Sequence, residues 1–256
     1  MRFFLSAADW PPEATEVFLD EAESRHAASV LRVRAGDGVD IFDGAGRVAA
    51  AVVMEALRNR VRGRLGAVRR VEAPAARLIL AVAVPKGSTM EWIVEKAVEL
   101  GATEIIPLLT RRTVVRLDRA EGAARQRKWE KVAVEAGKQS GQDWLPRVRP
   151  PLTLEEALAA APPGAFQWPL VASLQPDARP MASVLREAAA DRPADAPGLA
   201  DAAIWIGPEG DFDAGEYAQL RAAGLRPVTL GRLVLRVETA ALYCLSVVRH
   251  HQQAPC

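Results

Sequence analysis

The sequence has few of the residues that mark disulfide-bonded or metal-binding proteins. Only two of its 256 residues are cysteines, Cys244 in an apolar run and Cys256 at the end. They indicate no disulfide framework and favour a reducing cytosol. The three histidines, His26, His250 and His251, have no cysteine or carboxylate cluster at ligand spacing. The sequence therefore predicts no metal site.

Long apolar runs and an excess of one charge are also missing. No stretch approaches the roughly 18–20 apolar residues of a membrane-spanning helix, and the first residues lack the apolar core of a signal peptide. We therefore expect a soluble, cytoplasmic protein. The formal net charge is +1, so any attraction to nucleic acid has to come from local basic surfaces. The length allows one large domain or two smaller ones.

Three common motifs are absent as well. The chain has no G-x-S-x-G elbow, no G-x-G-x-x-G after a strand and no G-x-x-x-x-G-K-[ST] loop. These absences argue against an α/β-hydrolase triad. They also argue against the usual nucleotide cofactors of an α/β sheet.

Residues 1–72 are predicted to form a small, β-rich domain. Two β-prone runs, 39–42 and 47–53, flank an Asp-Gly pair and a second glycine, which predicts a hairpin. A short helix is expected at 24–33. Its expected apolar side consists of Ala27, Val30 and Leu31.

Arginines alternate along the stretch that follows the hairpin. In a strand, Arg58, Arg60, Arg62 and Arg64 would share one face. Such a face suits a phosphate backbone, but it equally suits a solvated strand, and the pattern leaves both interpretations open. A second basic segment, 111–131, contains eight basic side chains and three acidic ones. Its Trp129 falls on the stripe of a helix expected at 121–140, where burial is favoured over base stacking.

From residue 76 onward the pattern is that of an α/β domain, after a boundary at the Ala-Pro-Ala-Ala stretch, 73–76. The continuous apolar run 78–84 is typical of a strand covered on both faces. A helix and a second strand at 104–109 complete a parallel β-α-β unit. Later strands are expected at 170–174, 202–206 and 226–230. Capping boxes are expected at Ser88 with Glu91, Thr153 with Glu156, and Asp213 with Glu216.

Two glycine turns near the end of the chain are the strongest functional signal. Ile-Gly-Pro-Glu-Gly, 206–210, and Leu-Gly, 230–231, each follow an apolar run that predicts a buried strand. Open α/β sheets bind ligands just beyond the carboxyl ends of their strands. Glycine permits close backbone approach, Pro208 stiffens the turn and Glu209 adds a carboxylate. These turns therefore predict a ligand pocket.

Together with Leu-Arg-Val-Glu-Thr at 235–239, these motifs resemble the RsmE family of 16S ribosomal RNA uridine-N3 methyltransferases, in the SPOUT superfamily. Further matching motifs are Val-Leu-Arg at 30–32, Phe-Asp-Gly at 42–44, Glu-Lys-Ala at 95–97, Glu-Leu-Gly at 99–101 and Gln-Ser-Gly at 139–141. The resemblance implies an α/β fold in which residues 76–256 form a SPOUT-type parallel sheet with a C-terminal trefoil knot. Residues 1–72 would form a PUA-like, RNA-binding β-barrel.

The resemblance also implies which residues bind S-adenosylmethionine. They are Leu174, Ile206, Gly207, Pro208, Glu209, Gly210, Leu230, Gly231 and Leu235. Arg236 is the first catalytic candidate, stabilising the developing uridine anion or orienting the base. Glu238 is a second candidate that equally fits a carboxylate favouring the start of a helix. The expected RNA-binding residues are Arg2, Arg25, Arg32, Arg58, Arg60, Arg62, Arg64 and Arg112.

Three positions depart from the family pattern. Asp211 stands in place of a second glycine, and Leu233 and Gln142 stand in place of arginines. The expected partners are 16S ribosomal RNA in the small ribosomal subunit and a second copy of the chain, with no membrane and no metal. The resemblance implies a homodimer through the knot region, and a broad apolar face of the last helix is expected to be covered by that partner. That face consists of Ala241, Leu242, Leu245 and Val248.

Two other functions stay open. One is methylation of a different RNA acceptor, such as a ribose 2′-hydroxyl. The other is a non-catalytic, RNA-binding role in ribosome assembly.

Overall fold

The computed structural model describes residues 1–190 and 200–253. The chain divides into two compact units. Unit 1 consists of Met1–Ala73 and Val134–Leu145, and unit 2 of Pro74–Ala133 and Pro146–Cys256. Most of the loop expected at 191–201 lies outside the described residues.

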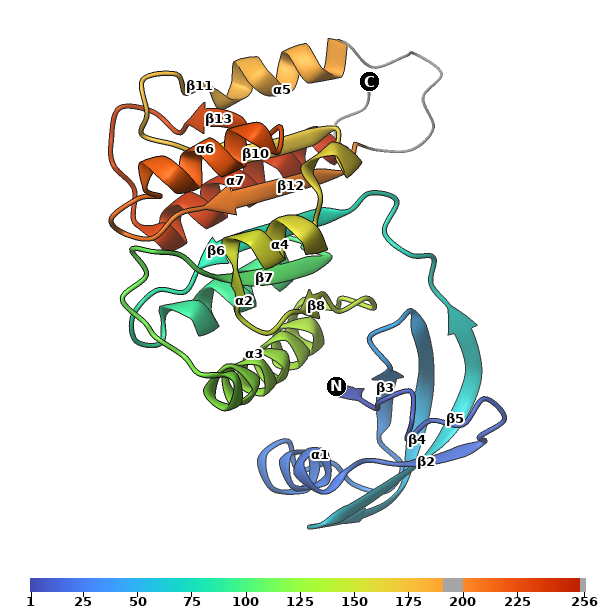
Figure 1. The fold of residues 1–256 in the computed structure, drawn as a ribbon. Helices are drawn as coiled ribbons and strands as arrows, with labels where there is room; N and C mark the ends of the chain where they lie inside the picture. The colour runs from blue at the N-terminus through green and yellow to red at the C-terminus, as the bar shows by residue number, and fades with distance from the viewer. Residues whose placement is uncertain (191–199, 254–256) are drawn as a thin grey trace. The chain divides into compact units, whose positions relative to one another are not determined.

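Unit 1 is built on a five-stranded sheet with the order β1-β3-β4-β5-β2 (Figure 1). Its elements are β1 (Arg2–Phe4), β2 (Glu16–Phe18), α1 (Glu21–Arg25), the π-helical η1 (His26–Val30), β3 (Gly38–Phe42), β4 (Arg47–Leu57) and β5 (Arg60–Arg70). β1 pairs with β3 in parallel, and the remaining pairs are antiparallel. The pairing of Phe42 with Val48 confirms the predicted hairpin.

The helical segment of unit 1 differs from the expected one. The Asp20 carboxylate accepts the Glu23 N–H at 2.7 Å, so α1 already begins at Glu21. The wider π-helical turn of η1 then changes which side chains face inward. Ala27 is buried, but Val30 is 64% exposed and Leu31 38% exposed. The expected apolar side was therefore wrong for these two residues.

Unit 1 also includes the end of the helix α3 (Arg119–Ser140) and the turn after it. The Lys138 ammonium lies 2.7 Å from the Glu23 carboxylate, and both side chains are about nine-tenths buried. Gly137 has no room for a side chain, because a Cβ would lie 2.3 Å from Leu145 Cδ2. Unit 1 is thus assembled from two segments that are far apart in the sequence.

Unit 2 contains an eight-stranded, wholly parallel sheet with the order β11-β13-β10-β12-β6-β7-β8, and β9 pairs with β7. The strands are β6 (Leu78–Ala83), β7 (Glu104–Leu109), β8 (Arg147–Val148), β9 (Leu152–Thr153), β10 (Trp168–Ala172), β11 (Arg179–Pro180), β12 (Ala202–Ile206) and β13 (Arg226–Thr229). The helical elements, besides α3, are α2 (Thr89–Glu99), α4 (Leu154–Ala160), the 3-10 turn η2 (Pro163–Ala165), α5 (Met181–Ala190), α6 (Ala214–Ala222) and α7 (Val237–Gln253). The predicted β-α-β unit and the later strands are confirmed.

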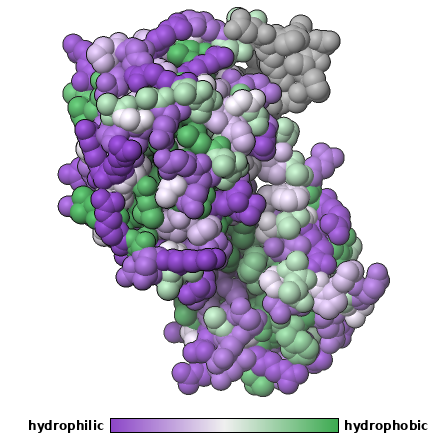
Figure 2. Space-filling view, in the orientation of Figure 1, coloured by the Kyte–Doolittle hydropathy of each residue, from purple (hydrophilic) through white to green (hydrophobic). Residues whose placement is uncertain are grey.

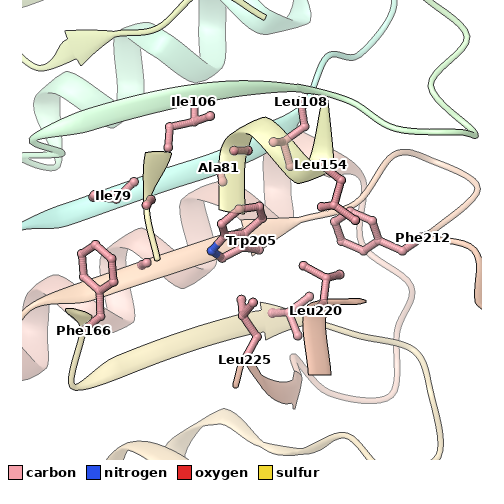
Figure 3. Close-up of a cluster of buried hydrophobic side chains, with 14 of the residues drawn as sticks. Ile79, Ala81, Ile106, Leu108, Leu154, Phe166, Trp205, Phe212, Leu220 and Leu225 are labelled. Atoms are coloured by element: carbon pink, nitrogen blue, oxygen red, sulfur yellow. The ribbon is translucent and has the colours of Figure 1, made fainter. Parts of the chain in front are cut away.

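Helices cover both faces of this sheet, as the apolar strands predicted. In Figure 1, α4 and α6 lie in front of the central strands, and α7 lies behind them. Every residue of β6 and β12 is buried. On the α4 and α6 face, a cluster forms around Trp205, with Phe212, Leu220 and Leu225 beside it (Figure 3). Trp129 of α3 is fully buried, which confirms the packing role favoured for it.

Two of the three expected capping boxes are present. Thr153 with Glu156 and Asp213 with Glu216 each make both reciprocal hydrogen bonds. Ser88 makes no side-chain cap, so the third expectation was wrong. The Glu91 carboxylate pairs instead with the Lys128 ammonium at 2.5 Å.

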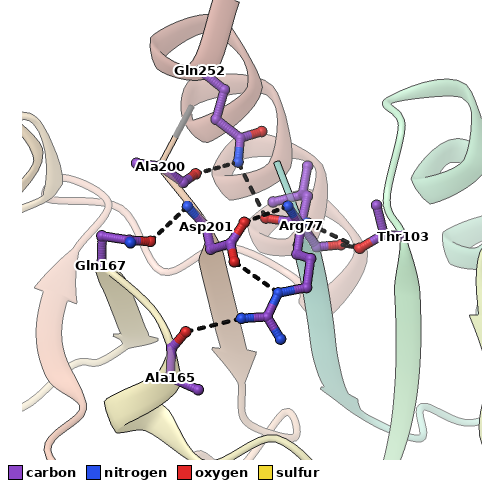
Figure 4. Close-up of polar contacts among 8 residues, drawn as sticks. Arg77, Thr103, Ala165, Gln167, Ala200, Asp201 and Gln252 are labelled. Carbon is purple, nitrogen blue, oxygen red and sulfur yellow. Dashed lines mark hydrogen bonds and ion pairs between the residues drawn. The ribbon is translucent and has the colours of Figure 1, made fainter. Parts of the chain in front are cut away.

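Polar contacts tie the amino ends of β6 and β12 to the end of α7 (Figure 4). The Arg77 guanidinium and backbone N–H both donate to the Asp201 carboxylate, at 2.7 and 2.6 Å. Gln252 donates to the Ala200 carbonyl at 2.7 Å and to the Arg77 carbonyl at 3.2 Å. The amino ends of these two strands are therefore held by internal hydrogen bonds.

The apolar face of α7 does not require a partner chain. Ala241, Leu245 and Val248 are completely buried, because α7 packs on β6, β12 and α2 of its own unit. The expectation that a partner covers these three residues was therefore wrong, and Leu242, the fourth residue of the face, is half-buried.

Within residues 1–190 and 200–253, no helix is long and apolar enough to span a membrane. Hydrophilic and hydrophobic residues are interspersed over the visible surface in Figure 2.

Candidate functional site

A cavity lies at the carboxyl ends of three adjacent strands, β13, β10 and β12. Its volume is about 80 Å³. The lining residues are Ala172, Ser173, Leu174, Ile206, Gly207, Pro208, Glu209, Asp211, Thr229, Leu230, Gly231, Leu233, Val234, Leu235, Val237 and Ala240. Because all three strands are parallel, their carboxyl ends bring three separate loops to one place.

Eight of the nine residues expected to bind the cofactor line this cavity, and Gly210 is the exception. A Cβ on Gly210 would lie 3.6 Å from Arg112 Cδ, so this glycine adjoins the basic segment 111–131. The lining residues outside that prediction are Ala172, Ser173, Asp211, Thr229, Leu233, Val234, Val237 and Ala240. Most adjoin predicted positions in the sequence, and Val237 lies within the Leu-Arg-Val-Glu-Thr motif at 235–239.

The turn after β12 depends on close backbone packing. A Cβ on Gly207 would lie 3.0 Å from the Phe212 ring and 3.2 Å from its backbone nitrogen. The Asp211 N–H donates to the Pro208 carbonyl at 2.9 Å and closes the turn. Asp211 has a φ of 61°, a left-handed conformation that glycine adopts far more readily.

The loop after β13 leaves apolar side chains in solvent. Gly231 has a φ of 119°, and its carbonyl accepts a hydrogen bond from the Thr229 hydroxyl at 3.2 Å. Leu233 and Val234 are 78% and 75% exposed, and Leu174 across the cavity is 60% exposed. Exposed aliphatic side chains around one cavity mark a surface that a ligand can cover.

The lining has the chemistry to hold S-adenosylmethionine. Aliphatic side chains suit the faces of an adenine ring, and the glycine-bearing turns let backbone groups approach its polar edge. The charged lining residues are both acidic, Glu209 and Asp211, which suits the positive charge of a sulfonium. The residues therefore fit this cofactor.

The two catalytic candidates lie at the start of α7, beside the cavity. Arg236 is exposed, and its backbone carbonyl accepts the Ala240 N–H at 2.8 Å. It stands between two lining residues, Leu235 and Val237. Glu238 lies in the first turn of α7, where a carboxylate interacts favourably with the helix dipole.

The basic segment 111–131 reaches the cavity loop through Arg112. Its guanidinium donates to the Gly210 carbonyl at 2.7 Å. The neighbouring Arg111 donates its backbone N–H to the buried Glu216 carboxylate at 2.8 Å. The start of this segment is thus attached to the turn after β12.

The arginine-rich strand of unit 1 is only partly as expected. β5 begins at Arg60, so Arg58 lies in the preceding turn, and the expected face of four arginines was wrong. The side chains of Arg60, Arg62 and Arg64 alternate with the buried Val61 and Gly63. Acidic partners accompany this face, because Arg62 lies 3.1 Å from Glu16, and Glu55 is 3.9 Å from both Arg60 and Arg62.

The other arginines expected to bind RNA have different surroundings. Arg2 contacts Asp143 and lies over the Phe42 ring, 4.1 Å from its centroid, so its guanidinium is largely occupied within unit 1. Arg25 is exposed and pairs with Glu21 at 2.7 Å. Arg32 is exposed, with a φ of 56°. Across the described ranges, no three histidines, cysteines or carboxylates are grouped so that they could hold a metal ion.

Comparison with known proteins places both parts of the chain among RNA methyltransferases. Residues 71–249 match the model of an RNA methyltransferase domain, and residues 19–65 that of an RNA methyltransferase PUA domain. A ribosomal RNA small subunit methyltransferase E from Synechocystis is 30% identical over 92% of this chain and 73% of the relative. Its counterpart from Mycobacterium bovis is 32% identical over 93% of this chain and 87% of the relative.

Solved structures show the same architecture. A ribosomal RNA small subunit methyltransferase E from Neisseria gonorrhoeae, bound to S-adenosylmethionine, has a TM-score of 0.81 and 27% identity. The superposition covers 97% of this chain and 96% of that one. A methyltransferase structure from Legionella pneumophila, also with bound cofactor, has a TM-score of 0.82, 28% identity and the same coverage.

Proposed function

This chain belongs to the ribosomal RNA small subunit methyltransferase E family, and from that premise we propose how its own residues carry out the reaction. The activity is methylation of N3 of a specific uridine in 16S ribosomal RNA. The observation that carries the proposal is the cavity at the ends of β10, β12 and β13, which collects eight residues expected to bind the cofactor.

S-adenosylmethionine, when bound, supplies an electrophilic methyl group on a sulfonium. Leu174, Leu233 and Val234 would cover it with aliphatic surface that is otherwise exposed. The backbones of Gly207 and Gly231 would come close to its polar groups, because neither residue has a side chain in the way. The carboxylates of Glu209 and Asp211 favour a positively charged ligand.

The uridine has to lose its N3 proton before or during attack, because the nitrogen carries that proton at neutral pH. A cation beside the base stabilises the negative charge that develops on the ring. Arg236 is exposed next to the cavity and takes this role in our proposal. Glu238 serves the start of α7 rather than the chemistry, since the first turn of a helix favours a carboxylate.

The proposal assigns residues 1–72 to RNA binding and 76–256 to methyl transfer. The exposed arginines of unit 1 and the segment 111–131 are each proposed to bind RNA. The partners are 16S ribosomal RNA of the small subunit and a second copy of the chain at the C-terminal knot region. Trp92 of α2, at 41% exposure, is an apolar side chain that favours self-association. Light scattering of the purified protein measures its mass and tests the dimer.

The decisive experiment is methylation of small subunits or 16S ribosomal RNA that lack the mark, followed by mass spectrometry of the nucleosides. The proposal expects 3-methyluridine at one site. It also expects Arg236→Ala to abolish methylation while S-adenosylmethionine still binds, with near-normal turnover contradicting the role of Arg236. A 2′-O-methylated product would instead indicate a different acceptor. Absence of S-adenosylmethionine binding in calorimetry would favour a non-catalytic assembly factor.

A further inference from the structure

Asp211 is an unusual residue for its backbone conformation. Its φ of 61° lies in the left-handed region, where only it and Arg32 occur among the described residues other than glycine. The Asp211 carboxylate compensates by accepting two hydrogen bonds on the same oxygen, Oδ1. The Phe212 N–H donates at 2.9 Å and the Tyr217 hydroxyl at 2.8 Å.

Tyr217 is well placed to be a permanent donor. It is 1% exposed, lies on α6 and packs edge to face on Phe212 with ring centroids 5.6 Å apart. Burial raises the pKa of the Tyr217 phenol above its ordinary value, contact with the Ser173 hydroxyl opposes this, and the Asp211 carboxylate raises it further. The phenol therefore stays protonated at neutral pH and donates to the carboxylate.

The hydrogen bond between the pair closes one loop of the cavity. Asp211 belongs to the loop after β12 that lines the cavity, and Tyr217 lies on α6, the helix that follows this loop. The bond therefore holds the loop against that helix. Phe212, which follows Asp211 and contacts the Tyr217 ring, is also the ring against which Gly207 packs.

We propose that Asp211 and Tyr217 form a positioning pair that holds the loop after β12 in the shape that binds S-adenosylmethionine. The inference rests on the proposed function for the identity of the ligand. It assigns no chemical step to either residue. A loop ordered before binding loses less conformational freedom on binding, so the pair increases affinity. Without the hydrogen bond from Tyr217, the left-handed backbone conformation of Asp211 would be less well stabilised.

Three variants separate the parts of the pair. Tyr217→Phe removes only the hydroxyl and keeps the ring against Phe212. Asp211→Asn removes the charge but keeps an acceptor oxygen. Asp211→Gly removes the acceptor and relieves the left-handed conformation. Tyr243→Phe, at a tyrosine 44% exposed on α7, is the matched control for loss of a phenol.

The first measurement is hydrogen exchange of the amides of residues 209–212 in ligand-free protein. Tyr217→Phe and Asp211→Gly should speed exchange at these amides while other amides of the sheet are unchanged. The second measurement is calorimetry with S-adenosylmethionine. We expect affinity about tenfold weaker for Tyr217→Phe, which removes a hydrogen bond to a charged group and leaves the Asp211 charge in place. Asp211→Asn and Asp211→Gly should weaken affinity further, because they also remove a carboxylate that favours the sulfonium. The KM for S-adenosylmethionine should rise while kcat at saturation stays within about twofold.

Three outcomes decide the inference. Unchanged exchange and unchanged affinity in Tyr217→Phe would overturn it. General acceleration of exchange throughout unit 2 would also overturn it, because the pair would then be an ordinary stabilising contact. Failure of the unaltered protein to bind S-adenosylmethionine overturns the proposed function instead, and the exchange data still show whether the pair orders the loop after β12.

Discussion

The Arg112 guanidinium donates a hydrogen bond to the Gly210 carbonyl, 2.7 Å away. Gly210 is the last residue of the Gly-Pro-Glu-Gly turn, and Arg112 is the second residue of the basic segment 111–131 that we assign to RNA. The bond therefore links the surface proposed for the substrate to the turn proposed for the cofactor.

Arg112→Ala should weaken S-adenosylmethionine binding by roughly fivefold, because an exposed charge-assisted hydrogen bond contributes about 1 kcal/mol. Calorimetry measures the change. Arg111→Ala is the control, since that guanidinium is 67% exposed and contacts Asp213 at 3.2 Å rather than the turn. Equal losses in the two variants would mean that only the local positive charge matters.

Gly207→Ala should destabilise the turn after β12. The added methyl group would lie 3.0 Å from the Phe212 ring, and overpacking of this kind costs about 1–3 kcal/mol. Chemical denaturation measures the free energy of unfolding. Gly164→Ala is the control, because a Cβ there meets no atom within 4 Å. A Gly207→Ala protein of unchanged stability would show that Phe212 moves aside freely.

Lys138→Met should lower stability by roughly 3 kcal/mol, because it leaves the Glu23 carboxylate buried without its cation. Replacing both residues, as Glu23→Leu with Lys138→Met, should recover most of that loss. A double variant as unstable as the single one would show that packing, not charge, explains the effect.

The same pair predicts a pH dependence. Burial raises the pKa of the Glu23 carboxyl above its ordinary value, and Lys138 only partly offsets this. The folded protein then binds more protons than the unfolded one between the two pKa values, so this group adds stability as pH falls through that window. The effect should be larger in Lys138→Met. Unfolding curves at pH 8 and pH 5 check the sign: the stability deficit of Lys138→Met relative to the unaltered protein should be smaller at pH 5 than at pH 8, and a larger deficit at pH 5 would contradict it.

Arg64→Ala should weaken RNA binding and make it less dependent on salt. Arg64 is 61% exposed, with its nearest carboxylate, Glu16, 3.9 Å away. Loss of one phosphate contact should reduce the slope of log affinity against log salt by about 0.7–0.9. Arg221→Ala is the control, because both of its bonds to Asp177 are 2.8 Å long. An unchanged slope for Arg64→Ala would remove this strand from the RNA surface.

The sequence alone predicted an element correctly where its residue pattern favours a single local structure. The apolar run of β6 predicted a strand buried on both faces, and the Asp213–Glu216 spacing predicted a capping box. The capping box predicted at Ser88 is absent. Ser88 makes no side-chain cap, and Glu91 pairs with Lys128 of another helix. The prediction for Arg58 was also wrong. Arg58 lies in the turn between β4 and β5, and the position of a hairpin turn depends on how the two strands pair.

The sequence by itself determined the strands, most helices, the two glycine turns and the family motifs, because periodicity and backbone preference act between near neighbours. Only the tertiary structure decided that α7 is covered by its own sheet, that residues 134–145 pack with the N-terminal unit, and that the Tyr217 hydroxyl donates to Asp211. These relationships join residues on different elements. They depend on how the elements pack in space, which no local pattern in the chain encodes.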